Sequence, residues 1–537
     1  MPLLSVEWAR WLQARGVRYV FGVPGGPSIP YMEALRKAGL EFVLVANEQS
    51  AGMMADVCGR LTGIPGVCHA TFGPGATNLA TGVGGARLDR SPLLAFTTEV
   101  RDADRGRKVQ MNIDHQALFR PLTKWTTRLS RENWRETLDT AFQIALAELP
   151  GPVHIGLPAD LEGEVPAAAI SSDLAKPMPA PPDPLQLREA EQLLQKAKRP
   201  LLAVGLTAAR LGLHPLIRRF VARHNIPVLL TPMAKGILPE TDPRYAGVLF
   251  HAHSDRLAPL CRQADLVVGI GYDSVEFNYE AWLPHVPLLH FDSEPPDISP
   301  EYDVAGAVVG DLSASLSQLL TWSLPEYAWD LAVVDDHKQK LFQALHPGGG
   351  TTFTPADAIT ELQATLPPNT ILTADVGAHL HLLGQLWRVA EPGRLLMTNG
   401  WSSMGFGIPA ALGAKLCRPD SPVVGFTGDG GFLMNCGELL TARRRGLNVV
   451  IVVLCDKNLS LIEIKQQWKQ VPQYETALYE GEYFAADRFL GVPVLKARDR
   501  AEMRASLQAA LTAAGPVIIE AVVDGSDYAR LVSQTYK

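Results

Sequence analysis

Short apolar runs alternate with amphipathic stretches along most of the 537-residue chain. Brief apolar runs bounded by Gly or Pro predict buried strands. Stretches with apolar residues every three or four positions predict helices. Because strands that alternate with helices form parallel sheets covered by helices, we expect an α/β protein.

The predicted strands fall into three segments, and we expect one doubly wound parallel sheet in each, since the chain is too long for a single core. Residues 1–165 form the first segment, with strands predicted within 19–26, 42–47, 66–75, 93–100 and 152–159. A Pro- and Ala-rich linker precedes the second segment, 185–325, with strands within 200–205, 226–232, 266–272 and 287–292. The third segment, 353–537, has strands predicted within 370–377, 394–399, 422–431, 448–456, 491–497 and 516–524.

Composition and charge narrow the class of protein. The chain is 47% hydrophobic and 20% charged, with a net charge of −7 and no basic block. This balance disfavours nucleic acid or a membrane surface as a partner. No apolar run reaches membrane-spanning length, residues 1–17 lack the pattern of a signal peptide, and the six cysteines show no metal-binding spacing. We therefore expect a cytoplasmic protein.

Two acidic residues follow two apolar runs in the third segment. Asp429 lies in the turn Gly428-Asp429-Gly430-Gly431, and Asp456 follows the next run, one predicted helix and one strand later. Neighbouring parallel strands end at one edge of a sheet, so the two carboxylates are expected to lie together. An isolated Asp here is typical of a turn or helix cap, but a pair favours Mg²⁺, which binds carboxylates together with phosphate oxygens.

This motif resembles the signature of thiamine-diphosphate enzymes. The resemblance covers nearly the whole chain and implies a pyruvate oxidase- or acetolactate synthase-like architecture: an N-terminal pyrimidine-binding domain, 1–165, a central α/β domain, 185–325, and a C-terminal diphosphate- and Mg²⁺-binding domain, 353–537. It implies thiamine diphosphate as the cofactor, with Mg²⁺ bound by Asp429, Asp456 and the main chain of Asn458. Cys455 departs from the Asn usual in the family at that position.

Glu48, at the start of a predicted helix, matches the family's catalytic glutamate. That residue contacts atom N1′ of the cofactor pyrimidine, and the shared proton enables the 4′-amino group to deprotonate the thiazolium C2 atom. The alternative for an acidic residue at this position is stabilisation of the helix N-terminus by its charge.

Further cofactor contacts are implied by the resemblance in both outer segments. Met404 matches the bulky residue that holds the cofactor in its bent shape, with core packing as the alternative role. His379 and Gly377 are expected near the diphosphate, although a lone His often has a structural role. The remaining expected cofactor residues are Pro74, Gly75, Asn78, Ser403, Gly428, Gly430, Gly431, Ser460 and Leu461.

Several stretches resemble the FAD-independent, catabolic acetolactate synthases in particular. These stretches are 23–35, 73–82, 117–125, 267–284 and 515–531. Others are similar to carboxyethylarginine synthase, namely 55–63, 88–96, 233–239 and 402–414. The resemblance implies decarboxylation of a 2-oxo acid, pyruvate, followed by carboligation to a second carbonyl, with no FAD. It also implies a homodimer or homotetramer with active sites between subunits.

The expected substrate region departs from the acetolactate synthases. Ser28 stands where they carry Lys, Asn47 where they carry His, and Phe72 where they carry Ser. Gln110 and Met111 stand where they carry a His-Gln pair. Loss of positive charge beside a substrate carboxylate weakens the case for two pyruvates.

Residues after Asp456 bear on the outcome of the reaction. Ile462 stands where simple decarboxylases of the family carry Glu, and an apolar residue there favours carbon–carbon bond formation over protonation. Lys465 either meets an anionic substrate or is a solvated helix lysine. A 2-oxo-acid decarboxylase, or another lyase or carboligase including a carboxyethylarginine synthase-like one, remains the alternative. A non-catalytic scaffold is disfavoured because Glu48 and both metal carboxylates are retained.

Overall fold

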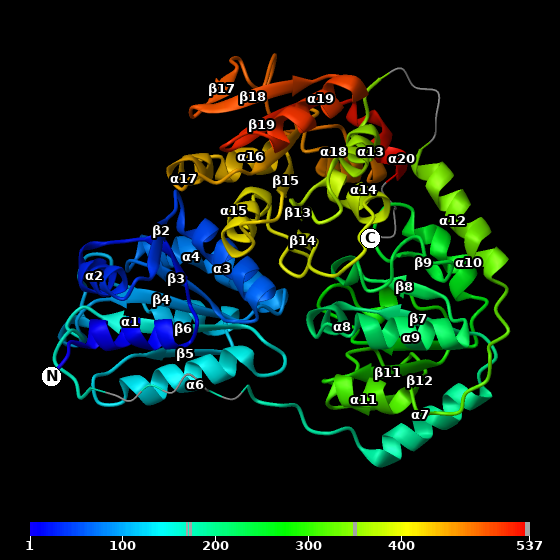
Figure 1. The fold of residues 1–537 in the computed structure, drawn as a ribbon, viewed down its shortest axis with the longest axis horizontal. Coiled ribbons are helices and arrows are strands. Elements are labelled where there is room, and N and C mark those ends of the chain that lie inside the picture. The colour runs from blue at the N-terminus through cyan, green and yellow to red at the C-terminus, as the bar shows by residue number, and fades with distance from the viewer. Residues whose placement is uncertain (168–169, 171–173, 175, 347–351, 532–537) are drawn as a thin grey trace.

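The computed structural model describes residues 1–167, 170, 174, 176–346 and 352–531. In this part of the chain the strands form three sheets, each packed between helices (Figure 1). The pairings are parallel except that of β17 with β18. The predicted α/β class is therefore confirmed. Parts of the predicted linker and of the stretch before residue 353 lie outside the described residues.

The N-terminal sheet has the strand order β2-β1-β3-β4-β6-β5. Its strands are β1 (Tyr19–Val23), β2 (Glu41–Leu44), β3 (Gly66–Ala70), β4 (Leu93–Glu99), β5 (Trp125–Arg128) and β6 (Pro152–Pro158). Its helices are α1 (Leu4–Ala14), α2 (Ile29–Lys37), α3 (Glu48–Thr62), α4 (Pro74–Leu88), α5 (His115–Phe119) and α6 (Trp134–Leu146). Strands β3 and β4 are buried along their whole length, so the middle of this sheet belongs to the core of the protein.

The central sheet has the order β12-β11-β10-β7-β8-β9. Its strands are β7 (Pro200–Val204), β8 (Val228–Leu230), β9 (Tyr245–Val248), β10 (Leu266–Ile270), β11 (Leu288–Asp292) and β12 (Val304–Val309). Its helices are α7 (Pro184–Lys196), α8 (Leu206–Arg210), α9 (His214–His224), α10 (Ala258–Cys261) and α11 (Leu312–Leu319), and α12 (Leu331–Leu345) leads towards the C-terminal part (Figure 1).

The C-terminal sheet has the order β14-β13-β15-β16-β19-β18-β17. Its strands are β13 (Ile371–Ala374), β14 (Leu395–Met397), β15 (Val423–Gly428), β16 (Val450–Cys455), β17 (Arg488–Phe489), β18 (Val492–Ala497) and β19 (Val517–Val522). Its helices are α13 (Pro355–Thr365), α14 (Ala378–Leu386), α15 (Gly407–Cys417), α16 (Asp429–Asn435), α17 (Glu438–Arg444), α18 (Ser460–Trp468), α19 (Arg500–Leu511) and α20 (Tyr528–Leu531).

One predicted element is wrong. A single helix was expected between Asp429 and the strand before Asp456, but the structure has two short helices, α16 and α17. They are separated by Cys436 and Gly437. Glycine is a poor helix former, and the break turns the chain so that α17 begins against the N-terminal sheet.

The N-terminal and C-terminal sheets share one apolar core. Helix α3 packs against α15, and the two lie side by side near the centre of Figure 1. Met54 of α3, Phe406 and Leu412 belong to the same buried cluster. Burial of such side chains contributes on the order of 2 kcal/mol each, so the helix that begins at Glu48 is held firmly against the C-terminal sheet.

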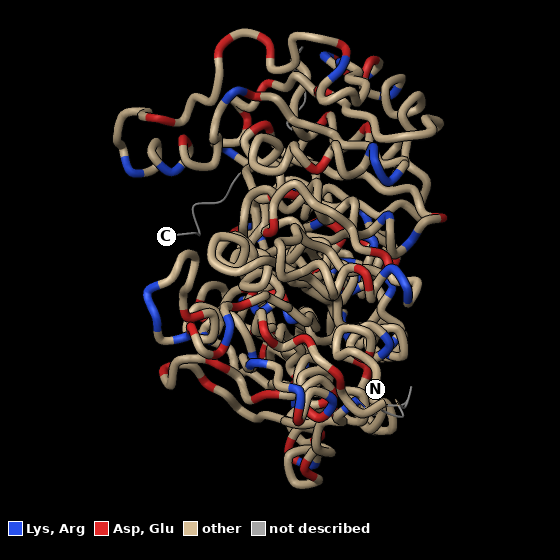
Figure 2. Tube along the Cα trace, turned by 90° about the vertical axis from the view of Figure 1, so that its left-hand side faces the viewer, with Lys and Arg blue, Asp and Glu red and all other residues tan. Residues whose placement is uncertain are grey.

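Charge distribution, helix length and the cysteines add three further facts. Basic and acidic side chains are interspersed along the trace of the whole molecule (Figure 2). None of the described helices has the length and apolar character needed to cross a membrane. The six cysteines are free, with Cys417 and Cys436 partly exposed and the other four buried.

Candidate functional site

The sheet register brings the two predicted metal carboxylates to one edge. Strands β15 and β16 pair in parallel, with Gly428 opposite Leu454. Asp429 follows the end of β15, and Asp456 follows the end of β16. The carboxyl edge of this sheet therefore carries both residues, as parallel pairing requires.

Hydrogen bonds orient both carboxylates. Asp429 Oδ2 accepts from the amide of Lys457 at 2.9 Å, and Asp456 Oδ2 accepts from the hydroxyl of Ser460 at 2.5 Å. Burial, with the Asp456 charge beside it, raises the pKa of Asp429 to about 7. Burial also raises the pKa of Asp456. Among the described residues no Lys or Arg side chain forms an ion pair with either carboxylate, so a bound cation would relieve their repulsion.

Four further residues predicted to contact the cofactor surround this pair. A Cβ atom on Gly428 would lie 3.3 Å from the His379 ring, and one on Gly430 would lie 3.2 Å from the end of Met404. His379 is buried, which lowers its pKa to about 4. Its Nε2 atom has no hydrogen-bond partner among the described residues. A buried polar atom without a partner is unusual and indicates a place where a ligand can bind.

Asp375 organises the same edge and was not singled out from the sequence. It is fully buried and accepts hydrogen bonds from the amide of Gly405 at 2.8 Å and from the hydroxyl of Thr427 at 3.0 Å. It thereby connects the loop between β14 and α15, which contains Met404 and is called the Met404 loop below, to the end of β15. Its position directly after the apolar run of β13 is the signal that could have identified it.

Glu48 lies with two of the predicted pyrimidine-side residues. It is the first residue of α3, and Asn47 caps that helix by accepting from the Gln49 amide at 2.9 Å. Glu48 Oε2 accepts from the side chain of Asn78 at 3.1 Å, and Oε1 lies over Gly75. Pro74 is the exposed first residue of α4, so the turn before α4 and the start of α3 face each other.

The predicted substrate residues of the N-terminal sheet follow β1, β2, β3 and β4, which are neighbours in the sheet. Ser28 is fully buried, and its hydroxyl accepts from the Gly25 amide at 3.0 Å and bonds to His69 Nε2 at 2.7 Å. Asn47 serves as the helix cap. Phe72 is partly buried and Gln110 is exposed, while its neighbour Met111 packs against Gly73.

Helix α18 carries the remaining predicted residues. Asn458 donates its amide to Asp456 at 3.2 Å, and Ser460 begins the helix. Leu461 is partly buried, whereas Ile462 and Lys465 are exposed. Ser403 is partly buried beside Met404, and Gly377 precedes α14. Gly431 is buried against Asp375.

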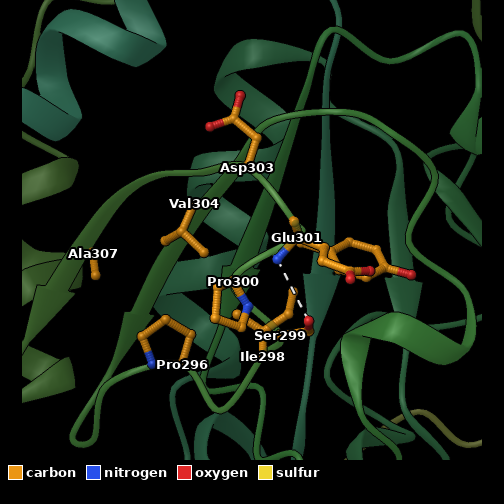
Figure 3. A pocket seen from close by; sticks show the side chains of 9 residues that line it. Pro296, Ile298, Ser299, Pro300, Glu301, Asp303, Val304 and Ala307 are labelled. Carbon is orange, nitrogen blue, oxygen red and sulfur yellow. Dashed lines mark hydrogen bonds between the residues drawn. The ribbon is translucent and has the colours of Figure 1, made fainter.

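The central domain carries a separate hollow. A space of about 710 Å³ beside β12 is lined by Pro296, Ile298, Ser299, Pro300, Glu301, Tyr302, Asp303, Val304 and Ala307 (Figure 3). None of the predicted cofactor or metal residues lines it.

Three protein-family models match the chain in the order of its sheets. Residues 7–118 match the N-terminal TPP binding domain of thiamine pyrophosphate enzymes, where TPP is thiamine pyrophosphate, another name for thiamine diphosphate. Residues 187–319 match their central domain, and residues 375–521 match their C-terminal TPP binding domain.

Curated relatives extend over nearly the full length. A probable acetolactate synthase large subunit of Methanocaldococcus jannaschii is 31% identical, over 96% of this chain and 91% of the relative. The large subunit of acetolactate synthase isozyme 2 of Escherichia coli is 30% identical, over 96% and 95%. An acetolactate synthase of Bacillus subtilis is 29% identical, over 97% and 93%.

Proposed function

Because the chain belongs to the thiamine pyrophosphate enzyme family, we propose that it is an acetolactate synthase-like enzyme that decarboxylates pyruvate and joins the remaining two-carbon unit to a second carbonyl. The near full-length similarity to acetolactate synthases supports this reaction. The observation that carries the proposal is the pair of carboxylates, buried Asp429 and partly buried Asp456, which lie at one sheet edge with no protein cation bonded to them among the described residues.

The residues at this edge fit a Mg²⁺-bound diphosphate. Asp429, Asp456 and the main-chain carbonyl of Asn458 would hold the metal, since oxygen ligands suit Mg²⁺. The Nε2 atom of His379 has no hydrogen-bond partner among the described residues and would be available to a ligand, and Gly428 and Gly430 leave room for close approach. Met404, half-buried against Gly430, would support the cofactor from the opposite side.

The chain's own residues do three things in this reaction. Thiamine diphosphate, when bound, supplies the carbon nucleophile and the electron sink. Glu48 would share a proton with the N1′ atom, and Asn78, which donates to its Oε2, fixes the orientation of the side chain. Ile462 and Lys465, both exposed on α18, would face the substrate, and Ile462 offers no proton. That absence favours ligation over release of an aldehyde.

An assembly of two or more copies forms part of the proposal. Leu433, Met434 and Leu440 on α16 and α17 are about half exposed, as is Leu44 of β2 beside them. An apolar patch of this kind next to the Glu48 loop is typical of a protein–protein interface. Its burial in a homodimer supports active sites built from two subunits.

We also propose that the enzyme works without FAD. In doubly wound sheets, nucleotides bind where the strand order reverses, which in the central sheet is between β7 and β10. There Gly205 and Gly271 bring the backbones together, and Thr207 donates its amide to the Gly271 carbonyl at 3.0 Å. Asp292 ends β11, and Asp273, bonded to Arg90, follows β10, so this edge presents carboxyl groups, which suit a diphosphate poorly.

Product analysis tests the proposal. The purified protein is incubated with thiamine diphosphate, Mg²⁺ and pyruvate, and the products are identified by mass spectrometry. We expect acetolactate and CO₂, at least a hundredfold less product from Glu48→Gln and Asp429→Asn (an order-of-magnitude expectation), and an unchanged yield from the exposed control Glu33→Gln. Acetaldehyde without any ketol would support the decarboxylase alternative instead. Visible absorbance of a bound flavin would contradict the absence of FAD.

A further inference from the structure

Glu438, the first residue of α17, reaches from the C-terminal sheet to the loop that carries Glu48. The side chain is fully buried. Its Oε1 atom accepts hydrogen bonds from the backbone amides of Ala46 at 2.9 Å and Asn47 at 3.3 Å. These are the two residues that precede Glu48.

Asn435, the last residue of α16, makes a second link to the same helix. Its Oδ1 atom accepts from the side chains of Gln49 at 3.1 Å and Ser50 at 3.3 Å, both in the first turn of α3. Its Nδ2 atom donates to the carbonyl of Gly405 at 2.7 Å, next to Met404. Asn435 therefore connects the start of α3 to the Met404 loop.

The residues that these two side chains bind lie immediately before and immediately after Glu48 in the sequence. Glu438 fixes the two amides before it, and Asn435 fixes the two side chains after it. Helix α16 begins at Asp429 and ends at Asn435, so within one chain seven residues of helix connect the carboxyl edge of the C-terminal sheet to the start of α3.

We propose that Glu438 and Asn435 are positioning residues that set the place of Glu48 by holding its backbone from across the domain boundary. The proposal rests on the proposed function insofar as it gives Glu48 its catalytic role. Neither residue is among those expected to contact the cofactor, so both act through Glu48.

Burying a carboxyl group is costly unless it is hydrogen-bonded, and Glu438 meets this condition through the two amides. Burial raises the pKa of Glu438, and the hydroxyls of Thr441 and Ser50 and the amides of Ala46 and Asn47 oppose that shift. Both amides bond to one buried side-chain oxygen that is shielded from water, so they are held more firmly than an exposed turn would hold them. Misplacement of a catalytic group by about 1 Å can lower a rate roughly a hundredfold.

Amide hydrogen exchange of the full-length protein without cofactor tests the anchoring directly. Glu438→Ala should speed exchange of the segment containing Ala46 and Asn47 at least about tenfold, because two of its amides lose their acceptor. Glu438→Gln should restore slow exchange, since its side-chain oxygen can accept the same bonds. Gln385→Ala is the control: Gln385 also accepts an amide across a domain boundary, from Val248 at 3.2 Å, and carries no charge. Equal exchange in Glu438→Ala and wild type would overturn the proposal.

Kinetics of the holoenzyme separate positioning from a loss of folding. Glu438→Ala and Asn435→Ala should each lower kcat roughly tenfold or more, with KM for pyruvate changed less than about threefold. In the Glu48→Gln background the same substitutions should have no further effect, because Glu48 is then no longer the group being positioned. An additive loss in the double variants would contradict the proposal. If wild type turned over no 2-oxo acid, the proposed function would fail, and the exchange experiment would still decide whether the anchor exists.

Discussion

His69, on β3, shows how a single buried residue ties the stability of the N-terminal sheet to pH. Its Nε2 atom bonds to the Ser28 hydroxyl at 2.7 Å, and burial lowers its pKa from 6.5 to about 4. The unfolded chain therefore binds a proton at His69 between these two pH values while the folded chain does not. The contribution of His69 to the free energy of unfolding is therefore fully present above pH 6.5. It falls as the pH drops towards 4 and does not change further below that pH.

Across this pH range the free energy of unfolding falls by roughly 3 kcal/mol, because each unit of pKa shift corresponds to about 1.4 kcal/mol. Replacing His69 with Gln should keep a hydrogen bond to Ser28 and remove this part of the pH dependence. Denaturant unfolding at pH values from 7 to about 4 measures the slope. His285→Gln, at an exposed position, should leave the wild-type slope intact. A His69→Gln slope equal to that of wild type would show that His69 titrates normally in the fold.

Residues near the site differ in how far the sequence predicts them. Asp429 and Asp456 follow apolar runs, so strand order alone places them at one edge. Ser28 was expected to face the substrate, but its hydroxyl is bonded within the protein, and a role in substrate binding stays a prediction. Glu438 carried no local signal, because its partners Ala46 and Asn47 lie almost four hundred positions away in the chain.

At the scale of elements, the strands that the apolar pattern predicts are mainly the inner ones. The strands it missed are β5, β9, β12 and β17, and each lies at an end of its sheet. Edge strands are short or partly exposed, as β5 and β12 show, so they lack the continuous apolar run that marks a strand covered on both faces. The helix break at Gly437 was missed because one glycine inside an otherwise helical pattern is often tolerated.

The close approach of α3 and α4 provides an element-scale prediction. A Cβ atom on Gly52 would lie 2.7 Å from the Cα atom of Gly82, so Gly52→Ala must push the two helices apart. These helices carry Glu48 and Asn78. We expect a loss of about 1–3 kcal/mol in unfolding free energy, typical of overpacking, and weaker binding of thiamine diphosphate by calorimetry.

Gly85→Ala is the matched control on α4. Nothing lies within 4 Å of a Cβ atom at Gly85, and removing a helical glycine should stabilise the protein by about 0.5–1 kcal/mol without altering cofactor affinity. Similar affinities for the two variants would show that helix spacing does not control the Glu48–Asn78 pair.

At the scale of the whole molecule, helices α16 and α17 leave an apolar surface exposed in the single chain. Helices α16 and α17 are packed on one side against the N-terminal sheet through Asn435 and Glu438. On the other side Leu433 is 52% exposed and Leu440 is 44% exposed. Apolar side chains exposed side by side in this way form a surface that assembly would cover.

Charge introduced into the patch should therefore dissociate the assembly. In a twofold interface each substitution occurs twice, and burying a leucine contributes about 1.5–3 kcal/mol, so Leu433→Glu with Leu440→Glu removes several kcal/mol and adds charge repulsion. Sedimentation velocity should show a monomer, and both cofactor binding and product formation should be lost because Glu48 and Asp429 would no longer meet across subunits. Leu185→Glu on α7, also 52% exposed, should remain assembled and active. A double variant that sediments like wild type would place the interface elsewhere, and a monomeric, fully active wild type would mean that each chain builds its active site alone.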